Sequence, residues 1–314
     1  MSVYTGYDIP PTGGPTAPES LFWYWVAERH AIYLRRKAGQ PKPWTTDPIL
    51  RDYKFTNPFR ENDRGTVWLR ENFLEPHRYC EDCDKGIRGG FPCQTCKGLG
   101  WEPDLLAFNI CWYRMFNWIG TGKRLGWQTD WPSETIKSAL KQGLAAGDQI
   151  FTGAHMLRSE YGKSKVDCIV DVCTTFWIHR HRIVDMCKMN SLQTTFQYLI
   201  EMPYVGPFLA YEMVTDMRHT RLLEDATDIM TWANPGPGAR RGLQRLQMPW
   251  KPDSAAIDSM QLLLSRSEER PNALPTDYPL LEMRDVEHSL CEFDKYCRTK
   301  FGEGRPRSRY PGAV

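Results

Sequence analysis

Four cysteines in the first third of the chain have the residue type and the spacing of a zinc site. Cys80 and Cys83 form one Cys-x2-Cys pair, Cys93 and Cys96 form a second, and glycines flank both pairs. Four thiolates fill the tetrahedral shell of Zn²⁺ and leave no open position, so such a site is structural. The sequence therefore predicts a zinc-binding insertion over residues 77–101 that folds around the metal. A redox pair or unrelated free thiols are the alternatives.

A second motif, over residues 192–218, reads as two helices joined by a short turn. The turn carries Tyr204, Val205 and Gly206. A turn of this form points backbone N–H groups outward at a helix N-terminus, where they hold a DNA phosphate without reading sequence. These three residues are therefore predicted to bind DNA. An ordinary helical hairpin is the alternative.

A third motif is a Gly-Pro-Gly turn that precedes a helix with two adjacent arginines. Gly236 and Gly238 expose backbone amides, and Arg240 and Arg241 follow directly. Amide donors and guanidinium groups suit a phosphate or a pyrophosphate. The sequence predicts a pyrophosphate-binding loop here, with a solvated basic turn as the alternative.

The elements that must position these motifs read as α-helices. Apolar residues recur at helical spacing between Ser20 and Gly39, and Asp47 followed by Pro48 has the form of an N-cap with proline at the first helical position. No stretch alternates persistently between apolar and polar residues, so the predicted fold class is mainly α. Further helices are expected over residues 104–118, 133–142, 166–186, 192–202, 207–218, 255–265 and 285–300.

Composition indicates a globular protein and sets few limits on its partners. Of 314 residues, 41% are hydrophobic, and 40 basic against 38 acidic residues give a formal charge of +2, so any surface for nucleic acid must come from local clustering. The first twenty residues lack the apolar core of a signal peptide, and no apolar run is long enough to span a bilayer. We therefore expect a soluble, intracellular protein with reduced cysteines. The six cysteines outside the zinc motif fall on predicted helices and are expected in the core.

The expected organisation has three parts. Residues 1–20 form an irregular arm, residues 21–301 form one helical catalytic domain that carries the zinc-binding insertion, and residues 302–314 form a basic C-terminal tail.

The hairpin motif and a following aspartate resemble the helix-hairpin-helix DNA glycosylases. In that plan a catalytic aspartate follows the hairpin glycine by about twenty residues, and Asp225 and Asp228 lie at this distance from Gly206. Bifunctional glycosylases carry a lysine just after the hairpin, where this chain has Phe208 and Leu209, which argues against lyase chemistry.

Several further stretches are similar to the bacteriophage thymine-hypermodification family. This family is also described as the α-glutamyl/putrescinyl-thymine pyrophosphorylases, the amino acid:DNA transferases, or the helical domain of 5-hydroxymethyluracil DNA kinases. The stretches are Glu28-Arg29-His30, Arg35-Arg36, Pro43 to Asp47, Asn57-x2-Arg60-x2-Asp63, Gly236 to Gly242 and Asp285 to Lys295. The resemblance runs from about residue 20 to residue 311.

The resemblance implies a fold, a reaction and partners. The fold would be a helix-hairpin-helix, glycosylase-like helical domain. The substrate would be double-stranded DNA in which a separate 5-hydroxymethyluracil DNA kinase has prepared a pyrophosphorylated thymine derivative. A phage-encoded transferase in the host cytoplasm would then displace pyrophosphate with the amine of an amino acid or a polyamine, after the base has left the stack. Zn²⁺ would be structural, and whether Mg²⁺ accompanies the pyrophosphate is left open.

The resemblance also implies roles for individual residues. The base that deprotonates the amine is sought among Asp228, Glu287 and His288, with Asp216 as a weaker candidate. An amino-acid carboxylate would need a bidentate arginine contact, for which the candidates are Arg29, Arg36 and Arg60. Other expected substrate contacts are Trp44, Asp47, Trp232 and Lys295.

Each of these roles has a structural alternative. Arg29 with Asp47 or Asp63 is equally well explained as a buried ion pair, and Glu287 with His288 as a cap or salt bridge of the last helix. Tryptophans are more often core residues than base-stacking platforms.

Three other functions compete with transfer. A glycosylase would use Asp228 to excise a modified base, and a non-catalytic subunit would bind DNA without forming a product. A kinase needs Gly-x4-Gly-Lys-Ser/Thr, and the nearest matches, at Gly120 to Arg124 and Gly162 to Ser164, lack the first glycine. Kinase activity is therefore expected to need another chain.

Overall fold

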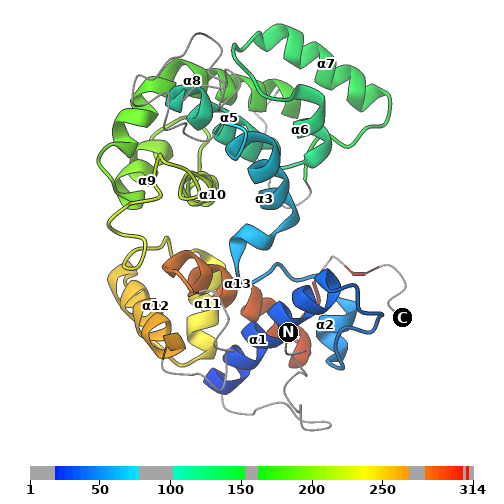
Figure 1. The fold of residues 1–314 in the computed structure, drawn as a ribbon, viewed down its shortest axis with the longest axis vertical. Helices are drawn as coiled ribbons and strands as arrows, with labels where there is room; N and C mark the ends of the chain where they lie inside the picture. The colour runs from blue at the N-terminus through cyan, green and yellow to red at the C-terminus, as the bar shows by residue number, and fades with distance from the viewer. Residues whose placement is uncertain (1–17, 78–101, 153–161, 269–279, 307–308, 311–314) are drawn as a thin grey trace, which may run out of the picture. The chain divides into compact units, whose positions relative to one another are not determined.

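The computed structural model describes residues 18–77, 102–152, 162–268, 280–306 and 309–310, and most of these residues are helical (Figure 1). Their one extended pairing is an isolated antiparallel bridge between Tyr53 and Arg309. The prediction of a mainly α fold is confirmed. Among the helices of the described ranges, none is long and apolar enough to cross a membrane. The chain divides into two compact units, the first made of residues 1–63 and 229–314 and the second of residues 64–228.

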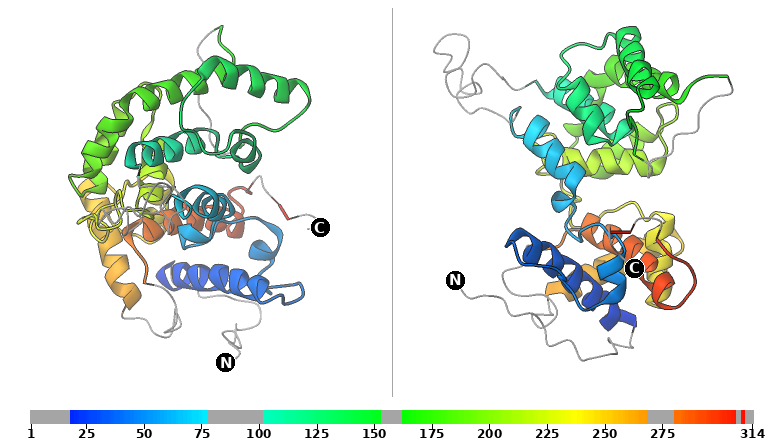
Figure 2. Two further views of the ribbon diagram at one scale, coloured as in Figure 1. Left: turned by 45° about the horizontal axis from the view of Figure 1, so that its top comes forward. Right: turned by 90° about the vertical axis from the view of Figure 1, so that its right-hand side faces the viewer.

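The first unit is built around its last helix, α13. This helix contacts α1, α2, α11 and α12 (Figures 1 and 2). Its apolar side enters the core, where Phe293 meets the ring of Phe22 edge-on at 5.4 Å and Tyr296 lies 6.3 Å from Phe55. The helices of this unit are α1 (Pro18–Lys37), α2 (Pro48–Asp52), the 3₁₀ turn η1 (Arg60–Asn62), α11 (Pro237–Arg245), α12 (Asp253–Glu268) and α13 (Met283–Lys300).

Helices α11 and α13 approach each other closely because α11 carries glycine at the contact. A Cβ on Gly242 would lie 2.5 Å from the carbonyl oxygen of Leu290, and a Cβ on Gly238 would lie 3.1 Å from Cβ of Cys291. No side chain fits between backbones at this distance. The two glycines therefore set how near the arginines of α11 come to α13.

Asp47 caps α2, as the sequence predicts. Its Oδ1 accepts hydrogen bonds from the backbone N–H groups of Ile49 (2.8 Å) and Leu50 (3.1 Å). Its Oδ2 accepts from the hydroxyl groups of Tyr24 (3.2 Å) and Tyr296 (2.7 Å), and the second of these bonds ties α2 to α13. The carboxylate is thus engaged in holding the fold.

The second unit surrounds α5, a helix that is buried on nearly all sides between Leu105 and Phe116. α5 packs on α8 and α10, and α8 in turn contacts α7 and α9 (Figure 2). The elements of this unit are α3 (Arg64–Leu69), the π-helical turn η2 (Arg70–Leu74), α5 (Pro103–Phe116), α6 (Ile119–Leu125), α7 (Ser133–Ala145), α8 (Lys165–Cys187), α9 (Leu192–Ile200) and α10 (Pro207–Met217).

The structure confirms the predicted long helices with ends shifted by a few residues. Four short elements were not predicted, namely η1, α3, η2 and α6. α3 and α6 contain glycines, which lower helix propensity. Gly122 of α6 is needed because a Cβ there would lie 2.4 Å from the ring of Trp68, a tertiary contact that local sequence does not reveal. The six cysteines predicted for the core are free thiols; five are buried and Cys291 is partly exposed.

The contact between α11 and α13 makes a testable prediction about stability. Gly242→Ala forces a methyl group against the backbone of α13, and we expect a loss of about 1–3 kcal/mol in the free energy of unfolding. Urea denaturation measures this loss. Gly65→Ala is the control, because a Cβ at Gly65 meets only ordinary contacts at 3.6 Å and beyond. Equal stability of the two variants would contradict the account.

Candidate functional site

The predicted site residues divide between the two units. Asp216, Asp228 and the hairpin residues Tyr204, Val205 and Gly206 lie in the second unit. The first unit contains Arg29, Arg36, Trp44, Asp47, Arg60, Trp232, Gly236, Gly238, Arg240, Arg241, Glu287, His288 and Lys295.

One face of α13 gathers most of the chemically useful groups of the first unit. His288, Glu292 and Lys295 lie on neighbouring turns of this face, because residues three or four apart share a helix face. Nε2 of His288 lies 2.5 Å from Oγ1 of Thr56 and 3.9 Å from Oδ2 of Asp63. We call this group the α13 cluster; its members are Arg29, Thr56, Asp63, His288, Glu292 and Lys295.

Glu292 forms hydrogen bonds with two other members of the cluster, Thr56 and Lys295. Its side chain is 3% exposed, and Oε2 accepts a hydrogen bond from the backbone N–H of Thr56 at 3.3 Å. Oε1 accepts from Nζ of Lys295. Although burial lowers the pKa of Lys295, the negative charge of Glu292 offsets this, and the pKa is raised overall. Lys295 is therefore a fixed cation suited to binding an anion and unsuited to acting as a neutral nucleophile.

Arg29 places a second fixed cation in the cluster. Its Nε donates a hydrogen bond to the carbonyl oxygen of Phe55 at 2.9 Å. Burial lowers the pKa of the guanidinium, while the charges of Asp63 and Glu292 act in the opposite direction. Arginine stays protonated in proteins even so. The sequence also allowed a buried ion pair between Arg29 and Asp63. Asp63 pairs instead with Arg60 and affects Arg29 only as a neighbouring charge.

The motif Asn57-x2-Arg60-x2-Asp63 folds onto itself. Asp63 accepts from Nη1 of Arg60 at 3.1 Å and from the backbone N–H of Asn57 at 3.0 Å. Burial raises the pKa of the Asp63 carboxyl, and the charge of Arg60 opposes this effect. Arg60 is 9% exposed, so it orients Asp63 more readily than it meets a ligand. Nδ2 of Asn57 is buried without a hydrogen-bond partner among the described residues.

The Gly-Pro-Gly turn faces a carboxylate of the protein itself. The backbone N–H of Gly236, at the N-terminus of α11, donates to Oε1 of Glu287 at 3.3 Å. A carboxylate at this position is stabilised by the helix dipole, just as a phosphate would be. Glu287 thus occupies the place that the sequence analysis assigned to pyrophosphate.

The two adjacent arginines of α11 serve different partners. Arg240 donates to the carbonyl oxygen of Trp250 at 2.7 Å and to Asp253 at 2.6 Å, which joins α11 to the start of α12. Arg241 turns to α13, where its Nε donates to Oδ2 of Asp294 at 2.8 Å. Its side chain is 50% exposed, and its terminal nitrogens have no hydrogen-bond partner in the described ranges.

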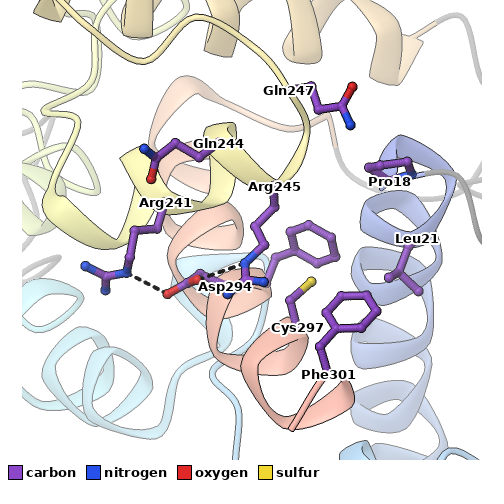
Figure 3. Close-up of a pocket in the computed structure, with 10 residues that line it drawn as sticks. Pro18, Leu21, Arg241, Gln244, Arg245, Gln247, Asp294, Cys297 and Phe301 are labelled. Carbon is purple, nitrogen blue, oxygen red and sulfur yellow. Dashed lines mark hydrogen bonds and ion pairs between the residues drawn. The ribbon is translucent and has the colours of Figure 1, made fainter. Parts of the chain in front are cut away.

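Asp294 is a buried carboxylate shared by guanidinium groups. It is 0% exposed, and besides Arg241 it binds Nε of Arg245 at 3.3 Å. Arg298 lies 3.3 Å from the same carboxylate. Figure 3 shows Arg241 and Arg245 reaching Asp294 from opposite sides. A pocket of about 460 Å³ opens beside Arg245.

Four more of the predicted substrate contacts also lie outside the α13 cluster. Arg36 is exposed in the last turn of α1, and Trp232 is 8% exposed. Nε1 of Trp44 donates to the carbonyl oxygen of Gln40 at 2.7 Å, which secures the turn after α1. Asp47 is the cap described above.

Asp216 and Asp228 are both fully engaged within the second unit. Asp216 is 2% exposed and forms a two-point ion pair with Arg114, whose Nη2 lies 2.6 Å from Oδ1. Asp228 caps α9: its Oδ1 accepts from the backbone N–H of Leu192 at 2.7 Å, and its Oδ2 from Gln193 at 2.9 Å and from the hydroxyl of Ser191 at 2.8 Å.

The hairpin turn presents an open helix N-terminus. Gly206 is the N-cap of α10, and no side chain of the described residues caps that end. A Cβ on Gly206 would meet nothing within 4 Å. Tyr204, with a φ of 63°, and Phe208 flank the turn with side chains 52% and 56% exposed. This end of α10 is therefore accessible to a ligand, whereas the start of α9 is sealed by Asp228.

The predicted zinc ligands Cys80, Cys83, Cys93 and Cys96 lie outside the described residues. Elsewhere, in the part of the chain that is described, no group of three or more His, Cys, Asp or Glu side chains is arranged to hold a metal. The zinc site stays a prediction.

Sequence reasoning missed two members of the cluster, Thr56 and Glu292, and named Asp63 only within a motif and as a possible ion-pair partner of Arg29. Glu292 was detectable, because it lies four residues after His288 and three before Lys295 and so shares their helix face. Thr56 was not, because its role comes from a contact with α13 across more than two hundred residues of chain.

The sequence of this chain is similar to a known protein family and to a phage protein. The model of a family described as "5-hmdU DNA kinase, helical domain" matches residues 17–84 and 96–305. The unmatched stretch between these ranges contains Cys93 and lies within the predicted zinc-binding insertion. A protein of Bacillus phage SP10 described as a "5-hmdU DNA kinase" is 24% identical over 313 residues. The alignment covers 91% of this chain and 46% of that relative, so the chain spans less than half of the relative's length. No solved structure matches.

The buried pair of Asp216 and Arg114 predicts a structural role for Asp216. Asp216→Asn removes the two-point ion pair of the buried guanidinium and leaves only the more distant Glu212, 3.8 Å away, so we expect the free energy of unfolding to fall by about 3–5 kcal/mol. Asp148→Asn is the matched control, because Asp148 pairs with Arg124 at the surface, where such pairs contribute about 0–1 kcal/mol. Urea denaturation of both variants measures the difference. An Asp216→Asn protein of normal stability would contradict a structural role.

Proposed function

The chain belongs to the family of the helical domain of 5-hmdU DNA kinases, and from this premise we propose that it is a transferase acting on modified thymine in DNA. The transferase displaces pyrophosphate from 5-pyrophosphoryloxymethyluracil with the amine of an amino acid or a polyamine. The observation that carries the proposal is the α13 cluster, in which fixed cations lie beside a histidine–carboxylate pair.

The reaction has simple requirements. The amine nitrogen attacks the methylene carbon attached to C5 of the uracil, a C–N bond forms, and the C–O bond to pyrophosphate breaks. The bonding electrons leave with pyrophosphate, and a proton passes from the nitrogen to a base. The enzyme must therefore supply a base for the amine and positive charge for the leaving group.

His288 is the proposed base. Its Nε2 lies within hydrogen-bond distance of Thr56 and 3.9 Å from the carboxylate of Asp63. A neighbouring carboxylate stabilises the imidazolium that forms when histidine takes a proton. Glu287, one residue earlier on α13, receives the N–H of Gly236 and is proposed to position the turn before α11.

Arg29, Arg241 and Lys295 are the proposed pyrophosphate ligands. Each is held by a partner in the fold: Phe55, Asp294 and Glu292 respectively. Cations that are fixed before the reaction stabilise developing negative charge without the cost of reorganisation. The amides of the Gly-Pro-Gly turn join them only if pyrophosphate displaces Glu287.

Base excision is less well supported by the contacts. A glycosylase-like mechanism needs the carboxylate of Asp228 near the sugar, whereas this carboxylate accepts three hydrogen bonds at the start of α9. Excision would have to break this cap. The third possibility, binding of DNA without catalysis, does not account for a histidine–carboxylate pair beside fixed cations.

The hairpin is the proposed DNA contact. The N-terminus of α10, which no side chain of the described residues caps, presents a positive helix dipole to one phosphate. Tyr204 and Phe208 beside it present exposed rings to the sugar or the bases. Zn²⁺ at the four cysteines is proposed to fold the insertion, and an upstream 5-hydroxymethyluracil DNA kinase is proposed to prepare the substrate.

The reaction itself gives the first functional test. DNA carrying 5-pyrophosphoryloxymethyluracil, incubated with the protein and a pool of amino acids and polyamines, is expected to yield an aminated nucleoside on mass analysis. His288→Gln is expected to slow its formation by about 10²–10⁴-fold, because the base is lost. The matched control is His181→Gln, an exposed histidine of α8. Abasic sites with no new nucleoside would refute transfer and support excision, and neither product would support a binding subunit.

The hairpin gives a second test. Gly206→Ala is expected to keep the fold, because its Cβ meets nothing within 4 Å, and to crowd a phosphate approaching the N–H groups. A loss of DNA affinity of about tenfold at all sequences is expected, since a phosphate contact carries no base information. Gly65→Ala serves as the control in fluorescence anisotropy with duplex DNA. Unchanged affinity of Gly206→Ala would remove the hairpin from the interface.

A further inference from the structure

A pocket lies in the first unit beside the α13 cluster, and most of its lining residues have no part in the proposed chemistry. Its volume is about 460 Å³, and its walls come from the start of α1, from α11 and from the C-terminal part of α13 (Figure 3). Leu21, Phe293 and Phe301 make part of the lining apolar, whereas Gln244 and Arg245 contribute polar groups. A ligand that fits must combine an apolar body with a polar head.

The charges around the pocket select the sign of that head. Asp294 is the one carboxylate among the described lining residues, and it is 0% exposed. Arg241, Arg245 and Arg298 all lie within 3.3 Å of it, and among the described residues only Arg245 has a second acidic partner, Glu303. Three guanidinium groups thus face two carboxylates. The excess positive charge favours an anionic head over a cationic one.

Arg245 binds the carboxylate of Glu303 at two points. Its Nη1 donates to Oε1 of Glu303 at 2.8 Å, and its Nη2 donates to Oε2, which is the two-point geometry preferred by arginine and carboxylate. Glu303 is 47% exposed on the segment after α13. Because Glu303 is partly exposed, a ligand carboxylate with the same two-point geometry can compete with it for Arg245.

Asp294 orients two arginines of α11. Its carboxylate accepts a hydrogen bond from Nε of Arg241 and another from Nε of Arg245, and Figure 3 shows the two side chains on opposite sides of it. Both arginines line the pocket, and Lys295 of the α13 cluster directly follows Asp294 in the sequence. A ligand there would therefore lie next to the cluster across a single carboxylate.

Gln247 adds an amide at the rim of the pocket. It has a φ of 57°, in the left-handed region that favours glycine. A glutamine kept in this conformation places an exposed side-chain amide among the lining residues. Together with Gln244 it can bind the polar groups next to a carboxylate.

We propose that this pocket binds an amino acid through its carboxylate at Arg245, with the ligand's side chain against Leu21, Phe293 and Phe301, and that it rejects polyamines. Assigning this ligand as the amine donor rests on the proposed transferase function. The binding site itself does not, because its contacts do not involve DNA. Of the two amine classes that the sequence leaves open, the pocket favours the one with a carboxylate.

Calorimetric titration of the full chain with single L-amino acids, putrescine and inorganic phosphate tests the proposal. At least one amino acid is expected to bind, and its own decarboxylated amine is expected to bind at least tenfold more weakly. Arg245→Gln is expected to weaken the amino acid by tenfold or more. Glu303→Gln is expected to strengthen it, because a competing carboxylate is removed; this gain is not explained by misfolding. Arg182→Gln on α8 is the matched control, with no change expected.

Several outcomes overturn the proposal. These are no binding by any amino acid, equal binding of the amino acid and its amine, tight binding of putrescine, or affinity that is insensitive to Arg245→Gln and Glu303→Gln. Phosphate that competes at the Arg245 site more tightly than any amino acid would reassign the pocket to the leaving group. The proposed function fails separately: normal amino-acid binding with no aminated nucleoside refutes transfer alone, and a putrescine-modified nucleoside without amino-acid binding refutes the pocket alone.

Discussion

The close packing of α11 on α13 is the constraint on which the first unit depends. Gly238 and Gly242 let the two backbones approach until no side chain fits between them. At this distance Arg241 and Arg245 of α11 reach the buried carboxylate of Asp294 on α13. A buried carboxylate without counter-charge is costly, so the arginines stabilise Asp294 as much as it orients them. The contact between α11 and α13 therefore stabilises the core and also orients the guanidinium groups of Arg241 and Arg245.

The rest of the α13 cluster follows from helix geometry. His288, on one face of α13, contacts Thr56 and lies near Asp63, both in the segment of residues 53–63. The same face of α13 carries Glu292 and Lys295. Positive groups are fixed by partners in the protein, and the histidine is fixed by a hydroxyl and a carboxylate. Such prior ordering suits a reaction in which a highly charged group departs, because the charges need not move at that moment.

The sequence predicted the helical fold well and the site only in part. Apolar spacing and caps are local, which is why the long helices and the Asp47 cap agree with the structure. Arg240 and Arg241 are neighbours in sequence, yet successive helical residues point about 100° apart, so one joins α12 and the other reaches Asp294. Asp228 has the spacing of a catalytic aspartate, but its tertiary neighbours make it a cap of α9. Nothing in the sequence around Thr56 marked it as a site residue, because only the tertiary fold brings it to α13.

The central claim is that the face of α13 beside Arg241 and Lys295 receives pyrophosphate. Hydrogen–deuterium exchange of the full chain with and without inorganic pyrophosphate tests it most directly, because amide protection reports where an anion binds. The account predicts protection of residues 53–63, of α11, of α13 and of α1 around Arg29, and this protection is lost in Arg241→Gln. Protection limited to the second unit, or protection that persists in Arg241→Gln, would contradict it.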